Sequence, residues 1–384
     1  MRSVNQFQRQ QTNASPVYQV TTIHPVSFHV DSLLVLFPLT VSELSQYRDH
    51  IDAADRERGG AFQLQTHPRG ARVAGEWRAS AEGAHLWVPL PTKRLQSAHH
   101  ATVLQNAVRL ELKSKWLMTH VGIGEWETLA DAVVAQFRQF GLAAEREDVL
   151  LSRVDVAVDL AGLDMNTIPL ETWQKGWVGG SSELHAYSKD GQIDGLQIGL
   201  RKSALFLRIY DKGRECEVNG GLPEWKAVWA SQTSEPVTRI EYSIRTRRAG
   251  FANLQTLNDV TRANALSVLA YATGGDWGRL CTPSATDRNR SRWPVHPVWK
   301  SVCEAVEGLA DAPVAPAVRM RRAPSMVVSD HELRSTGGRL SSLCAKVGHE
   351  QALGRPSTVD EVVERMAEAG VNLPDQAAAK YRAR

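Results

Sequence analysis

The octapeptide RVDVAVDL at residues 153–160 decides the fold, because polar and apolar side chains alternate along its length. A period of two is typical of a strand with one face in a hydrophobic core, since successive side chains point to opposite faces. One face of this strand carries Val154, Val156, Val158 and Leu160, and the other carries Arg153, Asp155, Ala157 and Asp159.

Three later segments alternate in the same way, namely LQIGLRK at 196–202, LFLRIYDK at 205–212 and TRIEYSIR at 238–245. If these segments are neighbouring antiparallel strands, one face of their sheet is apolar and covered by helices. The opposite face then gathers carboxylates, Tyr210 and many Arg and Lys side chains.

The remaining elements give both halves of the chain the same order. Strands are predicted at about 27–37, 62–66, 84–88, 107–112, 152–160, 195–200, 204–210 and 237–245. Helices are predicted from Thr40 or Ser42 onward and at about 125–140, 168–175 and 254–271. The predicted order of elements in each half is therefore strand, helix, several strands, helix. We predict an α+β fold of two antiparallel sheets with helices on one face, built from duplicated strand-helix-strand units at 27–145 and 146–284.

The two ends of the chain differ in character from residues 27–284. Residues 1–26 are predicted to form a flexible polar tail. Residues 285–384 are predicted to form an appendage, which begins with the basic, aromatic segment DRNRSRWPVHPVWK at 287–300. A Pro/Ala-rich linker follows at 311–324, and a short helix is predicted at 358–369.

Composition sets limits on the class of protein. A net charge of +3 and a pI near 8.7 permit nucleic-acid binding without requiring it. The four cysteines form no C-x-x-C pair, which argues against a zinc knuckle or a disulfide framework and favours a reducing compartment. The apolar run at 33–37 is too short to span a bilayer, and residues 1–16 lack the apolar stretch of a signal peptide. We expect a cytoplasmic protein without a membrane partner.

The polar sheet face has two interpretations. The first interpretation assigns the face no function, because charges that pair across strands are common on a half-solvated sheet. The alternative is a nucleophilic site, in which the Tyr210 hydroxyl attacks a DNA phosphorus and forms a covalent phosphotyrosine. A phenol with a pKa near 10 needs activation, which the neighbouring cations Arg208 and Lys212 would supply.

Carboxylates on the same face are candidate ligands for a divalent cation. Oxygen ligands suit Mg²⁺ or Mn²⁺, and Asp155 and Glu241 each lie mid-strand on the polar face. Asp159 is a weaker candidate, because it lies about 13 Å from Asp155 along an extended strand.

The other aromatic residues of interest have expected roles different from that of Tyr210. Tyr242 falls on the apolar face of its strand and Tyr271 on an amphipathic helix, so both are expected to pack in the core. Tyr187 is positioned to stack on a base. For Trp293 and Trp299, packing of the tail onto the body is favoured over base stacking.

The ordered trio RVDVAVDL, LQIGLRKSALFLRIYDKGRE at 196–215 and RIEYSIR at 239–245 resembles the replication initiation factor (Rep_trans) family over roughly residues 30–280. Its members start rolling-circle replication of plasmids and phages by nicking one strand through a 5′-phosphotyrosine. The resemblance implies that Tyr210 is the nucleophile, that Asp155 and Glu241 match acidic metal-site positions, and that Glu215 matches the trailing glutamate of the motif.

The resemblance also implies partners. These are origin DNA in duplex or hairpin form with a single strand at the nick, a host helicase and polymerase, and a second copy of the chain in a homodimer. The His-x-His metal motif of many other rolling-circle enzymes is missing, and the adjacent His99 and His100 are expected to be structural or solvated.

A set of basic residues is predicted to contact DNA phosphates. These are Arg153, Arg201, Lys202, Arg214, Arg239, Arg245 and Arg247. Three alternatives to a rolling-circle initiator stay open at this point: a conjugative relaxase of an integrative element, a non-catalytic DNA-binding regulator of a replicon, and a structural protein with a solvated polar face.

Overall fold

The computed structural model describes residues 22–58, 62–65, 76–81, 83–89, 106–189, 192–220, 222–229, 232–319 and 358. Residues 1–21 of the predicted N-terminal tail lie outside these ranges, as do His99 and His100. Of the helix predicted at 358–369, only residue 358 lies within them. Among the described residues, no helix has the length and apolar character needed to cross a bilayer.

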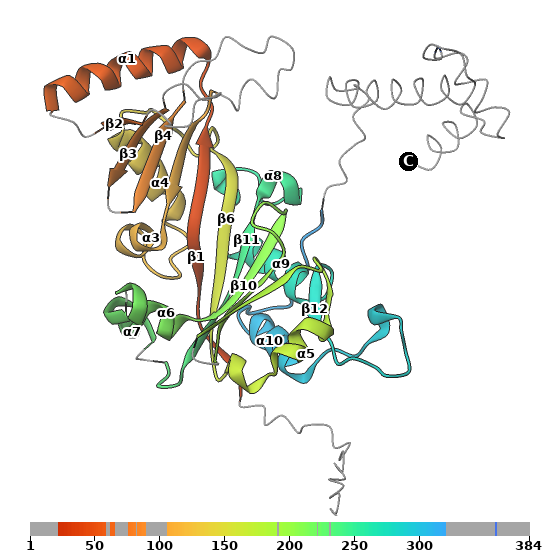
Figure 1. The fold of residues 1–384 in the computed structure, drawn as a ribbon. Coiled ribbons are helices and arrows are strands. Elements are labelled where there is room, and N and C mark those ends of the chain that lie inside the picture. The colour runs from red at the N-terminus through yellow and green to blue at the C-terminus, as the bar shows by residue number, and fades with distance from the viewer. Residues whose placement is uncertain are drawn as a thin grey trace, which may run out of the picture. The chain divides into compact units, whose positions relative to one another are not determined.

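One antiparallel sheet of ten strands forms the centre of the described fold (Figure 1). In spatial order the strands are β2 (Phe62–Gln65), β3 (Glu76–Ala81), β4 (Ala84–Val88), β5 (Val108–Leu112), β1 (His24–Phe37), β6 (Leu150–Ala161), β11 (Val237–Ile244), β10 (Leu205–Asp211), β9 (Gln192–Ile198) and β8 (Leu184–Lys189). A separate pair consists of β7 (Trp177–Gly179) and β12 (Gly278–Leu280).

The strand order repeats from one half to the other. In the first half β1 pairs with β5, and β4, β3 and β2 follow outward. In the second half β6 pairs with β11, and β10, β9 and β8 follow outward. This matches the predicted duplication of α+β units. The two predicted sheets are, however, a single sheet, because the first strands of the two halves, β1 and β6, pair along almost their whole length.

Nine helices are described alongside the strands. They are α1 (Val41–Arg58), α3 (Ser114–His120), α4 (Leu129–Gln139), α5 (Leu170–Gly176), α6 (Lys212–Asn219), α7 (Leu222–Trp229), α8 (Thr246–Ala249), α9 (Arg262–Thr273) and α10 (Pro297–Glu307). Three-residue 3₁₀ turns lie at Met165–Thr167, Leu257–Asp259 and Arg290–Arg292.

The apolar strand faces and the helices α4, α9 and α10 share one core. Val154, Val156 and Val158 are buried there together with Phe137 of α4. Tyr242 is also fully buried in this core, as its position on the apolar strand face predicts.

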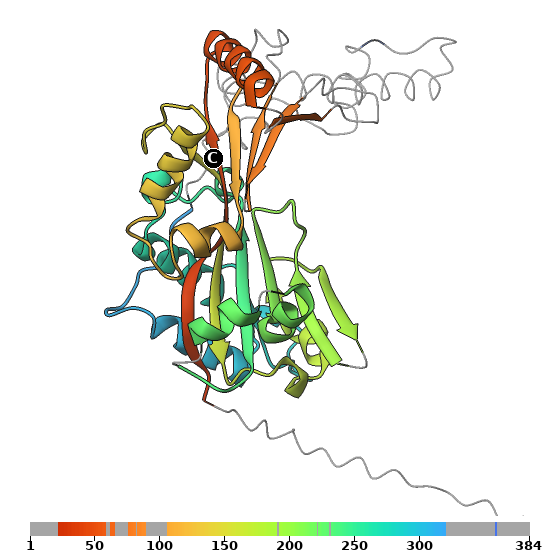
Figure 2. The same cartoon turned by 90° about the vertical axis from the view of Figure 1, so that its left-hand side faces the viewer.

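Helices also cover one end of the other face of the sheet. The prediction placed helices on one face only. α6 and α7 lie across the sheet from α9 and α10 (Figures 1 and 2). Trp225 and Trp229 of α7 pack there against Val26, Ala161 and Val237. The polar face is thus enclosed at one end instead of being open to solvent.

The first compact unit extends to Met320, beyond the predicted boundary at 284. Trp299 of α10 is 1% exposed, and its indole donates a hydrogen bond to the Thr273 carbonyl at 3.0 Å. Its ring meets the Trp177 ring edge-on at 5.2 Å between centroids. Trp299 therefore packs in the core, as the sequence favoured. The helix α10 belongs to the same compact unit as the sheet.

Replacing Trp299 with alanine should lower the free energy of unfolding by about 3–5 kcal/mol, because it leaves a large cavity between α10 and α9. Urea unfolding followed by circular dichroism measures the change. Val295→Ala is the control, since Val295 is 40% exposed. An unchanged midpoint in the Trp299 variant would contradict the assignment of α10 to the core.

Candidate active site

Tyr210 lies at a direct junction between a strand and a helix. It is the last residue but one of β10, and the next residue, Asp211, caps α6 by accepting a hydrogen bond from the Arg214 backbone N–H at 2.9 Å. An aspartate at this position satisfies one of the free N–H groups of the first helical turn. The junction fixes the Tyr210 backbone while Lys212 begins the helix beside it.

Glu241 of β11 is the partner of the Tyr210 hydroxyl. The hydroxyl donates to Glu241 Oε2 at 3.0 Å, while Arg208 forms an ion pair with the other carboxylate oxygen. Arg208 and Glu241 are opposite each other in the β10–β11 register. Glu241 is fully buried, so its charge depends on these two neighbours.

A β-bulge in β1 adds a carboxylate to the site. The pairing of β1 with β6 shifts between Val30 and Ser32, and Asp31 is the extra residue. A bulge lets two successive side chains face the same way. Asp31 therefore faces the polar side, where its Oδ1 lies 2.5 Å from an Arg239 nitrogen.

Arg239 is the central cation of the polar face. Its guanidinium contacts both Asp159 oxygens, at 2.6 and 2.9 Å, and is not exposed. The Trp225 ring lies 4.2 Å from the guanidinium carbon. Asp159 also accepts hydrogen bonds from the Ser27 hydroxyl at 2.7 Å and the Trp229 indole at 3.1 Å. This arrangement is a fully buried ion pair whose hydrogen-bonding groups are satisfied.

The carboxylates of the face fall into two electrostatic classes. Burial acts to raise the pKa of Asp31 and Asp159, but the charge of Arg239 together with hydrogen bonds and the nearby His29 outweighs it and holds both pKa values below their ordinary value. Burial and the charge of nearby Asp31 raise the pKa of Glu241 to about 7, and burial also raises the pKa of Asp155. Burial and the Glu241 charge raise the pKa of Tyr210 well above 10. The phenol is therefore neutral and hydrogen-bonded to a carboxylate that accepts protons readily.

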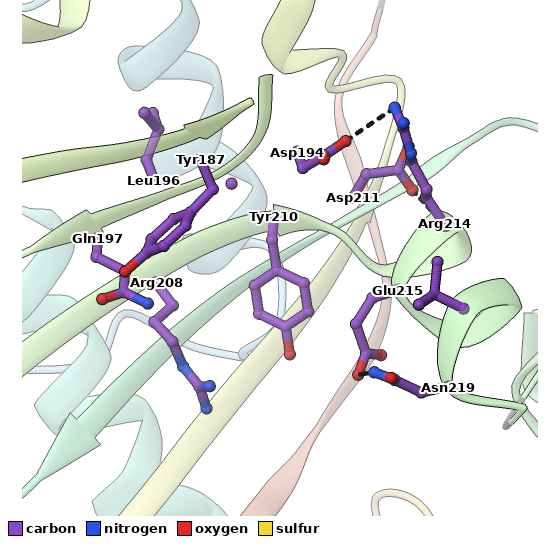
Figure 3. Close-up of a pocket in the computed structure, with 12 residues that line it drawn as sticks. Tyr187, Asp194, Leu196, Gln197, Arg208, Tyr210, Asp211, Arg214, Glu215 and Asn219 are labelled. Carbon is purple, nitrogen blue, oxygen red and sulfur yellow. Dashed lines mark hydrogen bonds and ion pairs between the residues drawn. The ribbon is translucent and has the colours of Figure 1, made fainter. Parts of the chain in front are cut away.

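The remaining residues predicted to be catalytic lie around Tyr210. The Lys212 ammonium is 5.9 Å from the centre of the Tyr210 ring and 2.7 Å from Glu215. Glu215 also accepts a hydrogen bond from the Asn219 side chain at 2.7 Å. Figure 3 shows Tyr210, Arg208 and Glu215 lining one pocket.

The predicted metal ligands do not form one cluster. Asp159 is occupied by Arg239, so its inclusion in a metal site was wrong. Within the described ranges, no group of three or more His, Cys, Asp or Glu side chains is arranged to hold a metal ion. Asp155 Oδ1 is nevertheless buried without a hydrogen bond, although the Arg153 side chain lies 3.3 Å away, and burial raises the pKa of this carboxyl. This fits Mg²⁺ held by one or two carboxylates and completed by substrate phosphates.

The residues predicted to contact DNA phosphates differ in their exposure. Arg239 is buried, so its prediction as a DNA contact was wrong. Arg153 pairs with Glu111 at 2.6 Å, and Arg214 pairs with Asp194 at 2.8 Å. Arg245 donates to the Arg201 carbonyl at 2.9 Å, close to exposed basic residues.

These exposed residues form a basic cluster at the turn after β9 and around α8. Its members are Arg201, Lys202, Arg247 and Arg248. Partial burial and the charges of Arg153 and Arg248 lower the pKa of Arg245, which reflects the gathering of like charges. A concentration of this kind suits an anionic backbone.

Sequence reasoning missed Asp31, Trp225 and Trp229. A signal for the bulge was present, since the apolar residues of β1 that join the main core are even-numbered at Phe28 and Val30 and odd-numbered at Leu33, Val35 and Phe37. The change of phase between residues 30 and 33 marks an extra residue. No comparable signal places α7 over the sheet.

No family model matches the chain, and no curated protein matches it. Among solved structures, the chain is similar to the rolling circle replication initiator protein from Geobacillus stearothermophilus, with 14% identity and a TM-score of 0.41. The similarity covers 77% of this chain and 99% of that one. A likeness at this level does not by itself indicate an activity.

Asp159→Asn should destabilise the fold by about 3–5 kcal/mol, because it leaves Arg239 with less than its full countercharge in a buried site. Urea unfolding measures the loss. Asp131→Asn, which breaks the exposed pair with Arg146, should leave the midpoint unchanged. Because the pKa of Asp159 is held below its ordinary 3.8, this stabilisation is present above that pH and is lost as the pH falls through the lowered pKa. A midpoint unaffected by Asp159→Asn would mean that the pair contributes nothing.

Proposed function

We propose that the protein initiates rolling-circle DNA replication by nicking one strand of origin DNA, with Tyr210 as nucleophile. The observation that carries this proposal is the hydrogen bond from the Tyr210 hydroxyl to buried Glu241, with Arg208 on the other carboxylate oxygen. A hydroxyl nucleophile joined to a base that a third group orients is the general pattern of nucleophilic catalysis. The resemblance of the strand motifs to replication initiation factors supports the same reading.

The chemical step follows from these contacts. The phenolic proton passes to Glu241 as the Tyr210 oxygen forms a bond to the scissile phosphorus. The bond from phosphorus to the 3′ oxygen breaks, and that oxygen takes up a proton from water and leaves as a hydroxyl. The 5′ phosphate stays joined to Tyr210, and a host polymerase extends the free 3′ end. Arg208 and Lys212 offset the charge on the phosphoryl oxygens.

We divide the roles of the two carboxylates that were predicted as metal ligands. Glu241 takes the proton, and Asp155 holds a divalent cation together with oxygens of the DNA. When bound, Mg²⁺ or Mn²⁺ polarises the scissile phosphate. Glu215 keeps Lys212 beside the tyrosine.

The partners follow from the reaction. The nicked strand has to be unwound from its complement, and a host helicase would do this. A second nucleophile is needed to close the circle, and a second copy of the chain in a homodimer would provide it. A conjugative relaxase would use the same chemistry on a transfer origin.

Tyr210→Phe should abolish nicking and leave DNA binding unchanged, because it removes only the nucleophilic oxygen. The assay uses supercoiled DNA that carries the flanks of the protein's own gene, with Mn²⁺, and a denaturing gel detects the protein–DNA adduct. Tyr271→Phe on α9 is the control and should nick normally. Nicking that persists in the Tyr210 variant would refute the assignment of the nucleophile, and binding without nicking by the unsubstituted protein would favour a non-catalytic regulator.

The division of roles predicts different responses to metal. Glu241→Gln should slow single-turnover cleavage by about 10²–10⁴-fold at every Mn²⁺ concentration, the usual contribution of a general base. Asp155→Asn should raise the Mn²⁺ concentration needed and be partly rescued by excess metal. Thermal unfolding of both variants checks the fold. Rescue of Glu241→Gln by excess Mn²⁺ would make Glu241 a metal ligand instead.

A further inference from the structure

Tyr187, Gly195 and Tyr210 form a row across three neighbouring strands. Gly195 of β9 is opposite Tyr187 of β8 in one register and opposite Tyr210 of β10 in the other. Directly paired residues project from the same face of a sheet. The row therefore consists of two tyrosines on either side of a position without a side chain.

The missing side chain at Gly195 leaves space between the two rings. A Cβ at this position would lie 3.2 Å from the Cβ of Tyr210, so any larger residue would fill the gap next to the nucleophile. A glycine inside a strand costs stability and often marks a place where a ligand approaches closely. Adjacent strands are about 4.8 Å apart, so the two tyrosines are separated by roughly twice that spacing.

A pocket of about 400 Å³ opens at this row (Figure 3). Pockets of roughly 300–1,000 Å³ hold small organic ligands. Besides the two tyrosines, the pocket is lined by the amide of Gln197 and by the apolar Val218. Charged groups of both signs also line it, namely Arg208, Arg214, Asp194, Asp211 and Glu215. Its apolar surface and its amide group suit a flat molecule with a polar edge.

Exposure of the apolar lining also indicates a ligand. Tyr187 is 51% exposed on the edge strand β8, and Val218 is 76% exposed on α6. Exposed large apolar groups beside a pocket are informative, whereas buried ones are expected. Within the described residues, the Gln197 side chain makes no hydrogen bond.

We propose that this pocket binds one unstacked nucleobase of the single strand, on the nucleotide next to the scissile phosphate. The inference rests on the proposed function and adds the element that positions the DNA. Tyr187 stacks on the base, the Gln197 amide hydrogen-bonds to its edge, and Arg208 is at the side of the pocket where the phosphate meets Tyr210. Bases in an intact duplex are stacked and paired, so the pocket selects single-stranded DNA.

Equilibrium binding tests the pocket separately from cleavage. The Tyr210→Phe protein is titrated with labelled oligonucleotides of dT, dA or dC of about 20 nucleotides, longer than a typical single-strand site. An abasic phosphodiester of the same length and charge is the matched probe. Tyr187→Ala removes the ring, Tyr187→Phe keeps it, and Gln197→Ala removes the amide.

We expect at least one base-containing oligonucleotide to bind roughly 5- to 150-fold more tightly than the abasic probe, the range that stacking of one base on an aromatic ring supplies. Tyr187→Ala should remove this preference without weakening abasic binding, and Tyr187→Phe should retain it. Gln197→Ala should change the order of preference among dT, dA and dC.

Two results would overturn the pocket and leave the proposed function intact. One is equal binding of base-containing and abasic probes, and the other is a preference that Tyr187→Ala does not change. Failure of the proposed function has a different signature, because the protein with Tyr210 restored would then form no adduct with its own origin DNA. Absence of binding to every probe, the abasic one included, would overturn both proposals.

Discussion

The guanidinium of Arg239 is a charge with no access to solvent, and much of the polar face is organised around its neutralisation. A buried charge is tolerated only when it is paired and its hydrogen-bonding capacity is satisfied. Arg239 of β11 meets Asp159 of β6 and Asp31 of β1, and Trp225 of α7 covers it. One cation thus joins three central strands, taken from both halves of the fold, to the helix that encloses this face.

This pairing also decides which carboxylates are left for chemistry. Asp159 and Asp31 are held ionised by Arg239, so neither accepts a proton near neutral pH. At Glu241 and Asp155, burial outweighs the neighbouring Arg208 and Arg153, the Asp31 charge adds to it, and the pKa values of both carboxyls rise. Carboxylates whose environments push their pKa values apart are the usual basis for separate acid, base and metal-binding roles. The hydroxyl of Tyr210 is bonded to Glu241, the carboxylate whose pKa lies near 7.

Two local departures from regular strand structure build the site on this frame. The bulge at Asp31 puts Asp31 and Ser32 together on the polar face and shifts the later core positions of β1 by one residue. The glycine at 195 removes a side chain where the pocket opens beside Tyr210. Each costs some strand stability, and each lies on the same face as the nucleophile.

The sequence by itself determined the α+β class, most of the central strands and the repeated order of elements, because alternation and helical periodicity are local properties. It also placed Tyr210, Arg208 and Glu241 on one face, since period-two geometry fixes sidedness. Only the tertiary structure decided that the two halves share one sheet and that Arg239 is buried against Asp159 instead of facing DNA. These outcomes depend on which strands pair and on where α7 lies, and such long-range contacts leave no local pattern in the chain.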